Sequence, residues 1–530
     1  MKNWGGGGWN CWVDVAAGAL EFDNYSELIF NTTRYGYDIL DHLRVVTDSL
    51  GNTTIITYNV LGQKIGMRDP DMGVWSYGYD AVGNLIPQTD ALNQVLWFKY
   101  DVLNRVTEKR QTGSGGPLLA RYWYDEAGHG AGVGQRTTMT DATGSTSWAY
   151  DAHGRVTSES KTINGAGTFT TSYAYDAMDR VVTMTYPSGE VVTQTYNNAA
   201  QLTQVRSATH NLAYASGMMY NPMGQLTQMS HGNNLTTTYT YAPLNSRLAR
   251  IKVGSWLDLS YGYDWVGNVK AITDTTNSGQ VQSFNYDALD RLITATTTSV
   301  GNGQYSESYQ YNAIGNITYT SRLGNYSYPA SGPTSVRPHA AAAAGSNQYT
   351  DDNNGNMLTR VEVSGTLRIT YTQAWDVENR LVAVTNTVTL TVTRFYYDGD
   401  GQRVKKVESK NTTSTTTAYL GALYEKNVTT GITTCYYYAG STRGMACRQS
   451  RSAALGRNGH TCICAKAGVV MATALPLLGV QYPSAIQSAG APVPPPDADS
   501  MAGLDDVDRA AAQRPPEREP FHNKTGRGRR

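Results

Sequence analysis

A ten-residue pattern that recurs along the chain constrains its fold more than any other feature of the sequence. YDVLNRVTEK at 100–109 returns in altered form as YDAVGNLIPQ at 79–88, YDAHGRVTSE at 150–159 and YDALDRLITA at 286–295. A unit this short cannot bury an apolar face alone, so neighbouring copies must pack on one another to build a core. The pattern therefore indicates one continuous array of repeats in the 530-residue chain.

Each unit can be aligned on an anchor residue, position 0, which is aromatic in every copy but one. The anchors are Tyr37, Tyr58, Tyr79, Tyr100, Tyr124, Tyr150, Tyr175, Tyr196, Tyr220, Tyr241, Tyr263, Tyr286, Tyr311, Asp351, Trp375 and Tyr397. Position +1 is Asp or Asn except at Ala242, and position +4 is Gly, Asn or Asp except at Ala200. Because Gly, Asn and Asp best tolerate positive φ, position +4 is predicted to be a left-handed turn residue.

The residues around the turn carry the period of a β-strand. An Asp or Asn at +1 can accept hydrogen bonds from backbone N–H groups a few residues on. Position +6 is apolar in most units, and Thr alternates with apolar residues in TVTLTVTRFYY at 387–397, which places the apolar set on one face. Each unit is thus predicted to be strand, Asx-type turn, strand, and the fold to be all-β: a long antiparallel sheet of repeated β-hairpins.

Twenty residues are assigned a structural role in these repeats. They are Tyr58, Tyr79, Asp80, Gly83, Tyr100, Asp101, Tyr150, Asp151, Gly154, Tyr175, Asp176, Tyr263, Asp264, Gly267, Tyr286, Asp287, Trp375, Asp376, Tyr397 and Asp398. The aromatic rows could stack on glycans, but cross-strand packing of Tyr is the simpler interpretation.

The repeated pattern resembles the YD repeats of the Rhs (rearrangement hotspot) family. The same repeat occurs in animal teneurins and in the C component of bacterial insecticidal toxin complexes. Residues 79–85, 150–156, 286–292 and 375–381 match it, and the resemblance covers 35–443. It implies a sheet that curls into a spiral or hollow shell, which encloses a C-terminal toxic domain in polymorphic toxins and supports cell adhesion in teneurins. The chain is expected to be a truncated member of this family.

The chain departs from the Rhs pattern after the repeats. Rhs toxins usually carry a DPxG-type motif there, as part of a self-cleaving aspartate site, and nothing after Tyr438 resembles it. Asp69-Pro70-Asp71-Met72-Gly73 lies inside the second repeat and is interpreted as a turn. The sequence also lacks H-E-x-x-H and G-x-S-x-G motifs. No catalytic residue is predicted, although a hydrolase with two facing carboxylates remains an alternative.

Composition divides the chain into three regions. Residues 1–34 are a poorly patterned lead-in, residues 35–443 hold the repeats, and the Ala/Pro/Arg-rich tail of 444–530 is predicted to be disordered or frameshifted. Within the repeats, 328–347 is rich in Pro, Ala, Gly and Ser, which indicates a surface excursion. This loop is either a flexible connection or a binding loop.

Three groups of possible metal ligands are each better explained without a metal. His460, Cys462 and Cys464, with Cys447 upstream, lack paired C-x-x-C spacing. DDNNGN at 351–356 and DGDG at 398–401 carry oxygen ligands but fall on the turn of the repeat, and neither is followed by the Glu that closes a calcium loop. We therefore expect no metal and no cofactor.

Charge and hydropathy limit the partners. The chain has 43 basic and 43 acidic residues, so no net charge attracts it to nucleic acid. No apolar segment is long enough to span a membrane, and the N-terminus lacks the apolar core of a signal peptide. The family is typically secreted or attached to the cell surface, which leaves the location of this chain open.

The leading hypothesis is a non-enzymatic scaffold, the shell of an Rhs-type protein that encloses or presents a toxin or another protein cargo. A cell-surface adhesion or carbohydrate-binding module that recognises glycans is the first alternative. The second is a non-functional gene remnant with exposed sheet edges.

Overall fold

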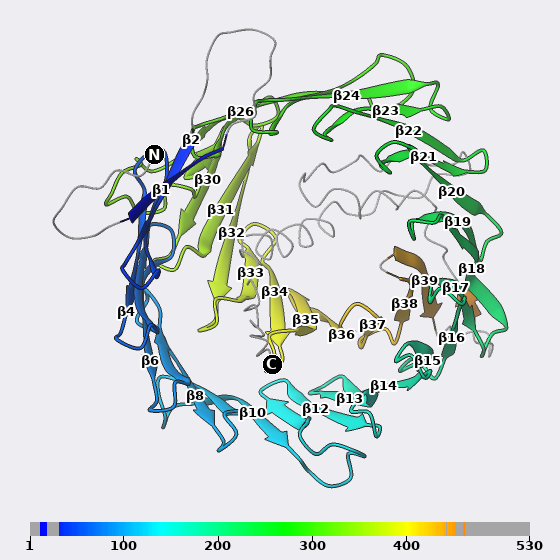
Figure 1. Ribbon diagram of the computed structural model, residues 1–530, viewed down its shortest axis with the longest axis horizontal. Coiled ribbons are helices and arrows are strands. Elements are labelled where there is room, and N and C mark those ends of the chain that lie inside the picture. The colour runs from blue at the N-terminus through cyan, green and yellow to red at the C-terminus, as the bar shows by residue number, and fades with distance from the viewer. Residues whose placement is uncertain (1–10, 18–30, 441, 451–458, 462–530) are drawn as a thin grey trace, which may run out of the picture. The chain divides into compact units, whose positions relative to one another are not determined.

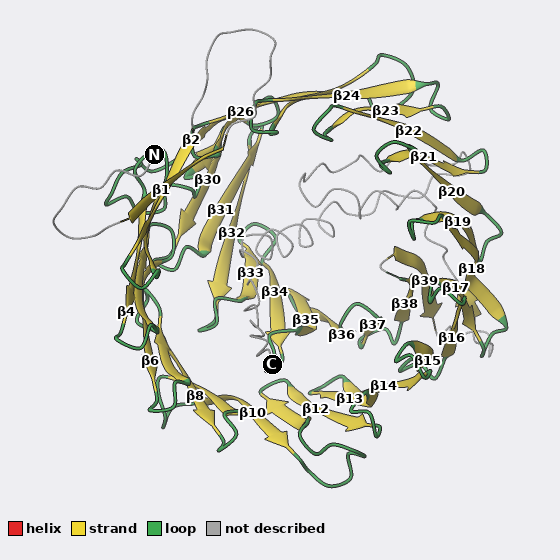
Figure 2. Ribbon diagram, in the orientation of Figure 1, coloured by secondary structure: helices red, strands yellow, loops and turns green. Residues whose placement is uncertain are grey.

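The computed structural model describes residues 11–17, 31–440, 442–450 and 459–461. These residues form forty β-strands joined by turns and loops, with no helix among them (Figures 1 and 2). The predicted all-β fold of repeated hairpins is confirmed. It follows that the described part of the chain holds no helix that could cross a membrane.

The strands in the first half of the chain are short and evenly spaced. They are β1 (Cys11–Ala17), β2 (Asn31–Tyr37), β3 (Leu43–Thr47), β4 (Thr53–Tyr58), β5 (Lys64–Asp69), β6 (Gly73–Tyr79), β7 (Leu85–Thr89), β8 (Val95–Tyr100), β9 (Val106–Gln111), β10 (Leu118–Tyr124), β11 (Arg136–Asp141), β12 (Gly144–Tyr150), β13 (Val156–Ile163), β14 (Gly167–Tyr175), β15 (Val181–Thr185), β16 (Val191–Tyr196), β17 (Leu202–Ser207), β18 (Leu212–Tyr220), β19 (Leu226–His231) and β20 (Thr236–Tyr241).

The second half continues in the same way, apart from the very short β29. Its strands are β21 (Leu248–Val253), β22 (Leu257–Tyr263), β23 (Val269–Asp274), β24 (Gln280–Tyr286), β25 (Leu292–Thr297), β26 (Ser306–Tyr311), β27 (Ile317–Thr320), β28 (Gly324–Ser327), β29 (Ala343–Ala344), β30 (Asn347–Asp351), β31 (Met357–Ser364), β32 (Leu367–Trp375), β33 (Leu381–Asn386), β34 (Thr391–Tyr397), β35 (Arg403–Lys410), β36 (Thr413–Leu420), β37 (Tyr424–Asn427), β38 (Thr433–Ala439), β39 (Thr442–Ser450) and β40 (Gly459–Thr461).

Every strand pairs antiparallel with the strand before it and the strand after it, which makes the described sheet a simple meander. All sixteen anchors are the last residues of their strands. We call the turn that follows an anchor a YD turn. The turns at the other ends of the strands lie along the opposite edge of the sheet.

The YD turn is held by the residue at +1. In the turn after β6, Oδ1 of Asp80 accepts hydrogen bonds from the backbone N–H of Val82 (3.0 Å) and of Asn84 (2.8 Å). At +4, Gly83 has φ of 97°, and even Ala200 adopts 62°. The left-handed conformation at +4 therefore belongs to the turn and not to the residue type. In the turn after β20, where the next strand begins at +7 with Leu248, Ser246 at +5 takes positive φ instead.

The anchor side chain links each YD turn to the one before it. The hydroxyl of Tyr100 donates to the carbonyl of Leu85, the first residue of β7, at 2.9 Å. The same bond to the first residue of the neighbouring odd-numbered strand is made by Tyr58, Tyr79, Tyr124, Tyr150, Tyr175, Tyr196, Tyr220, Tyr241, Tyr263, Tyr286, Tyr311 and Tyr397, and Trp375 makes it with its indole N–H. Burial raises the pKa of Tyr100, which keeps its hydroxyl a donor at neutral pH.

Arginine at +5 adds a second link. Nε of Arg105 donates to Oδ2 of Asp101 at 2.7 Å, and its guanidinium lies 4.3 Å from the ring centroid of Tyr124, the next anchor. Arg155, Arg180, Arg291 and Arg380 repeat both contacts in their own units. Consecutive turns are thus joined by hydrogen bonds and cation–π contacts as well as by the strands.

The sheet curls back so that strands distant in sequence share a core (Figure 1). The main cluster of buried apolar side chains combines residues of β13–β19, such as Val205 and Met229, with residues of β35–β38, such as Val404 and Tyr437. Strand β17 lies against β38. The core of this curled sheet is therefore formed between its middle and late strands.

Strands extend beyond both predicted limits of the repeat region, and β40 lies wholly within the predicted tail of 444–530. The backbone of β1 is within the lead-in of 1–34, and that of β39 continues the sheet past the predicted boundary at residue 443. Residues 462–530, which include Cys462 and Cys464, lie outside the described residues.

Two substitutions at position +4 should have opposite effects on stability. Gly83→Val should lower the free energy of unfolding by about 1–3 kcal/mol, because a β-branched residue is strained at positive φ. A Cβ atom there would also lie 3.2 Å from Nε2 of Gln63. Ala200→Gly should raise the free energy of unfolding by up to about 1 kcal/mol, since the strain of Ala in the left-handed conformation is removed. Urea unfolding of both variants tests this, and a shift of the same sign in both would contradict the assigned turn.

Candidate functional site: the seam between early and late repeats

Late repeats contact early repeats along a line that we call the seam. It consists of loop 328–342 and the YD turns 352–356, 376–380 and 398–402, which lie against β3–β13 and the turns between those strands. The repeat residues predicted from sequence are spread along the YD edge, each in its own turn. Among them, Asp398 makes a direct side-chain contact across the seam.

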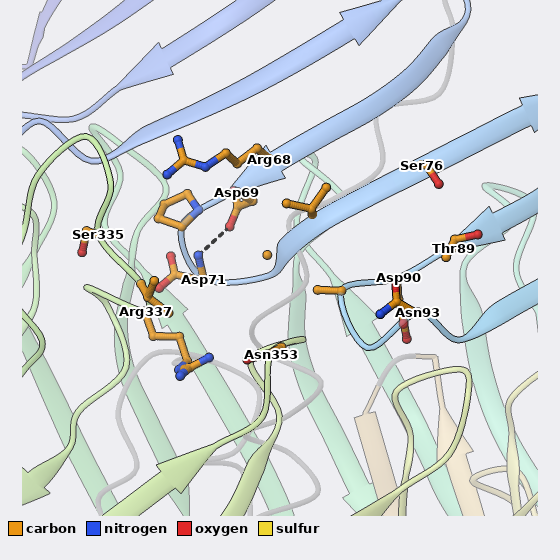
Figure 3. Close-up of a pocket in the computed structure, with 15 residues that line it drawn as sticks. Arg68, Asp69, Asp71, Ser76, Thr89, Asp90, Asn93, Ser335, Arg337 and Asn353 are labelled. Carbon is orange, nitrogen blue, oxygen red and sulfur yellow. Dashed lines mark hydrogen bonds between the residues drawn. The ribbon is translucent and has the colours of Figure 1, made fainter.

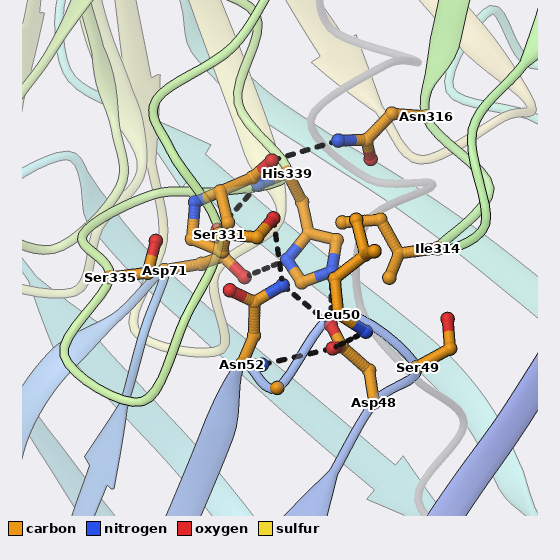
Figure 4. A network of polar contacts seen from close by, with 12 residues as sticks. Asp48, Ser49, Leu50, Asn52, Asp71, Ile314, Asn316, Ser331, Ser335 and His339 are labelled. Carbon is orange, nitrogen blue, oxygen red and sulfur yellow. Dashed lines mark hydrogen bonds and ion pairs between the residues drawn. The ribbon is translucent and has the colours of Figure 1, made fainter.

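Loop 328–342 does not extend freely but is bonded to two opposite-edge turns (Figure 4). Nδ1 of His339 lies 2.6 Å from Oδ2 of Asp71, and its Nε2 lies 3.5 Å from Oδ2 of Asp48. Asn52 donates to Oγ of Ser331 at 3.3 Å and accepts from the N–H of Gly332 at 2.9 Å. The excursion is thus part of the packed structure.

Electrostatics favour the charged form of His339. The hydrogen bond to the Asp71 carboxylate raises its pKa, and the charges of Asp48 and Asp69 act in the same direction, whereas burial opposes them. His339 therefore carries a positive charge between two carboxylates under mildly acidic conditions.

A polar cleft of about 370 Å³ lies beside this network (Figure 3). Its two guanidinium groups already have partners: Arg68 donates to the carbonyl of Pro333 at 3.3 Å, and Arg337 donates to that of Asp352 at 2.8 Å. Oδ1 of Asp69 accepts the N–H groups of Asp71 and Met72, so the Asp-Pro run forms a turn. These three charged side chains of the cleft therefore bond within the protein.

The YD turns of late repeats insert their tips into the early sheet. Nδ2 of Asn354 donates to Oδ2 of Asp90 at 2.6 Å, and both side chains are buried. Nζ of Lys109 lies 2.5 Å from Oε1 of Glu378, and both groups are largely buried. Both terminal guanidinium nitrogens of Arg136 donate hydrogen bonds to the carboxylate of Asp400, at 2.8 and 2.6 Å. This bidentate geometry makes Arg–carboxylate pairs strong.

Gly399 marks the closest approach across the seam. Its carbonyl accepts hydrogen bonds from Lys109 (2.7 Å) and from the hydroxyl of Tyr122 (2.8 Å). A Cβ atom at this position would lie 2.8 Å from both Cβ of Ala120 and Sδ of Met139, two fully buried residues. The glycine is therefore required by packing.

A buried carboxylate joins β38 to the middle of the sheet. The hydroxyl groups of Tyr214 and Tyr437 both donate to Glu190, one to each carboxylate oxygen, and the two rings stack with centroids 3.9 Å apart. Burial raises the pKa of both tyrosines, so they remain protonated donors. Both oxygens of the carboxylate are occupied, which is typical of a structural latch.

The described residues hold no cluster of three or more metal-ligating side chains. Both candidate calcium loops are YD turns, in which Asp352 and Asp398 bond to backbone N–H groups of their own turns. The side chains of Cys447 and His460 are outside the described part of the structure, as are Cys462 and Cys464.

Sequence reasoning missed the residues that join distant repeats, both in the seam and beside β38: Lys109, Lys161, Glu190, His339 and Gly399. Their partners lie more than 200 residues away, with the exception of Tyr214 beside Glu190. One signal was available, because position +5 after Tyr397 is Gln402, whereas the other units with Asp at +1 have Arg, Asn or His there. That change leaves the carboxylate of Asp398 without its usual local partner.

The His339 network should make stability depend on pH. The pKa of His339 is higher in the folded state than in the unfolded state, where it is about 6.5. Protonated His339 therefore stabilises the fold fully at pH values below the unfolded-state pKa, and this stabilisation is lost as the pH rises through the folded-state pKa. The melting temperature of the wild type should thus exceed that of His339→Asn by more at pH 6 than at pH 8.5. An equal difference at the two pH values would exclude a charged histidine in the seam.

The comparisons with known proteins agree with this architecture. The family model described as Teneurin YD-shell matches residues 32–183. The toxin subunit YenC1 of Yersinia entomophaga is 31% identical over 154 residues, which is 25% of this chain and 16% of YenC1. YenC2 of the same organism is 25% identical over 267 residues, which is 41% of this chain and 27% of YenC2. The chain therefore spans less than a third of either relative.

A similar fold occurs in the crystal structure of TcdB2-TccC3 without its hypervariable C-terminal region. The TM-score is 0.67 at 20% sequence identity, over 81% of this chain and 25% of the other. The match to the Teneurin YD-shell model and the similarity to toxin subunits accord with the repeated YD turns, so this chain resembles YD-shell proteins, and its curled meander has the fold seen in TcdB2-TccC3.

Proposed function

We propose that this chain is a non-enzymatic YD shell that joins a further YD-repeat sheet and, with it, encloses or presents a protein cargo such as a toxin. The observation that carries the proposal is the docking of late YD turns on the early sheet. At the seam, a run of late YD turns packs against early strands and their opposite-edge turns. A contact of this kind is needed to extend or close such a sheet.

Position +2 shows which YD turns are still available for such a contact. Val377, in a docked turn, is 8% exposed, whereas Val60 and Val102, at the same position in early turns, are 96% and 97% exposed. Ile39, Leu61 and Leu103 are also exposed in these early turns. A row of exposed apolar tips on one edge is typical of an interaction surface.

The relatives support a protein partner. YenC1 and YenC2 are described as toxin subunits, and TccC3 is found in a structure together with TcdB2. By analogy, the early YD turns of this chain would meet the opposite-edge turns of a second YD-repeat protein. The cargo would then lie on the inner side of the joined sheet.

Glycan binding is less well supported. One cleft with aromatic side chains is lined by Trp97 and Tyr100 together with Asn84 and Asp101. Nδ2 of Asn84 already bonds to Asp80 and Asn104, and Oδ2 of Asp101 bonds to Arg105. Few polar groups are left to orient a sugar hydroxyl.

The proposal is tested by co-expression of the full chain with TcdB2, the protein found together with TccC3, and by light scattering after size-exclusion chromatography. We expect a stable complex, and at least tenfold weaker binding for the double variant Val60→Asp, Val102→Asp at an unchanged melting temperature. Val388→Asp is the matched control, because Val388 is exposed on an opposite-edge turn. Failure of the wild type to bind, or equal binding by the Val60/Val102 variant, would overturn the proposal.

A further inference from the structure

One ion pair in the seam has the arrangement of a covalent cross-link. Nζ of Lys161 in β13 lies 2.7 Å from Oδ2 of Asp398 in the YD turn after β34. Their side chains are only 11% and 4% exposed. The amine and the carboxylate are thus held in direct contact inside the protein.

The carboxylate of Asp398 differs from those of other YD turns. In the two preceding units the side chain at +5 donates to Oδ2 of the turn aspartate, as Arg380 does to Asp376 at 2.8 Å and Asn356 does to Asp352 at 3.0 Å. In this unit position +5 is Gln402, and Oδ2 is instead turned to the amine of Lys161. The departure from the repeat thus presents one carboxyl group to one buried nucleophile.

The second oxygen of Asp398, Oδ1, is hydrogen-bonded in a way that would activate the carboxyl carbon toward a nucleophile. Oδ1 accepts hydrogen bonds from the backbone N–H of Asp400 at 3.1 Å and of Gln402 at 2.8 Å. Two backbone donors on one oxygen stabilise the negative charge that develops there when a nucleophile attacks the carbon. The Lys amine approaches from the side of Oδ2, which is the leaving oxygen.

A carboxylate that could move the proton is adjacent. Oε1 of Glu159 lies 3.9 Å from Nζ of Lys161, two residues along the same strand. It can take a proton from the attacking amine and return it to the departing oxygen. Lys161, Asp398 and Glu159 are therefore nucleophile, electrophile and proton carrier, held in place by the fold.

We propose that Lys161 and Asp398 form an intramolecular isopeptide bond. The lone pair of Nζ attacks Cγ of Asp398, a C–N bond forms, and the C–Oδ2 bond breaks. The ammonium and carboxylate together become an amide and one water, so neither oxidant nor reductant is needed. Oδ1 becomes the amide oxygen and keeps its two backbone donors.

A competing reaction is disfavoured by the same geometry. Asp398 precedes Gly399, and Asp-Gly sequences can lose water by closing on their own backbone nitrogen. Here the N–H of Gly399 donates to Oδ2 of Asp141 at 2.8 Å, which holds the nitrogen away from Cγ. Lys109 and Glu378 form a second buried pair of a lysine and a carboxylate in the seam. This pair can be compared with Lys161 and Asp398, because its carboxylate has an additional cationic partner: Arg380 binds Oε2 of Glu378 at 2.7 Å.

The test is peptide mapping of the purified full chain by mass spectrometry after denaturation and trypsin digestion. The bond predicts one branched peptide that contains residues 156–180 and 395–403, uncut after Lys161 and lighter than the two sequences by one water. Recovery of 395–403 as an unmodified peptide, with normal cleavage after Lys161, would overturn the proposal. A dehydrated 395–403 that is not joined to 156–180 would show backbone cyclisation and would also overturn it.

Variants separate the chemistry from a structural role. Lys161→Arg keeps the positive charge but should abolish the branched peptide, whereas Lys270→Arg, at an exposed lysine of β23, should leave its yield unchanged. Glu159→Gln should lower the yield at least tenfold in freshly purified protein while the variant still folds. An equal yield in Glu159→Gln would remove Glu159 from the reaction.

Discussion

The hydrogen bond from each anchor side chain to a backbone carbonyl of the neighbouring strand is the interaction on which the rest of the structure depends. A hairpin of two short strands has too little buried apolar surface to be stable alone. The bond from Tyr100 to Leu85, repeated at almost every unit, fixes each YD turn to the previous one and contributes about 1 kcal/mol per unit. The aspartate at +1 shapes the turn so that the next tyrosine arrives in position.

The seam depends on departures from this repeat. Val377 is buried where Val102, its equivalent, is exposed, and Gly399 allows contact with Ala120 and Met139. Where Gln402 stands at +5 after an aspartate, a buried lysine binds the Asp398 carboxylate in place of the +5 side chain. Regular units thus build the sheet, and irregular units determine where it meets itself.

The regular part of the fold could be predicted from sequence because its determinants lie within a few residues of one another. The Tyr, Asp and Gly positions predicted the strand ends and the turn, and Ala200 adopts the same conformation as the glycines. The curl and the seam could not be predicted, because contacts such as Lys161 with Asp398 join residues 237 positions apart and leave no local period. The contacts of loop 328–342 could not be predicted either, because its Pro and Ala residues give no indication that His339 binds Asp71.

Hydrogen–deuterium exchange of the full chain, compared between the wild type and Gly399→Val, tests the central claim that late YD turns pack on the early sheet. The added side chain would collide with Ala120 and Met139. The account predicts faster exchange in residues 120–141 as well as in 395–410, with no change in 263–286. Faster exchange confined to 395–410 would contradict it, because the early strands would then be stable without the turn that is docked on them.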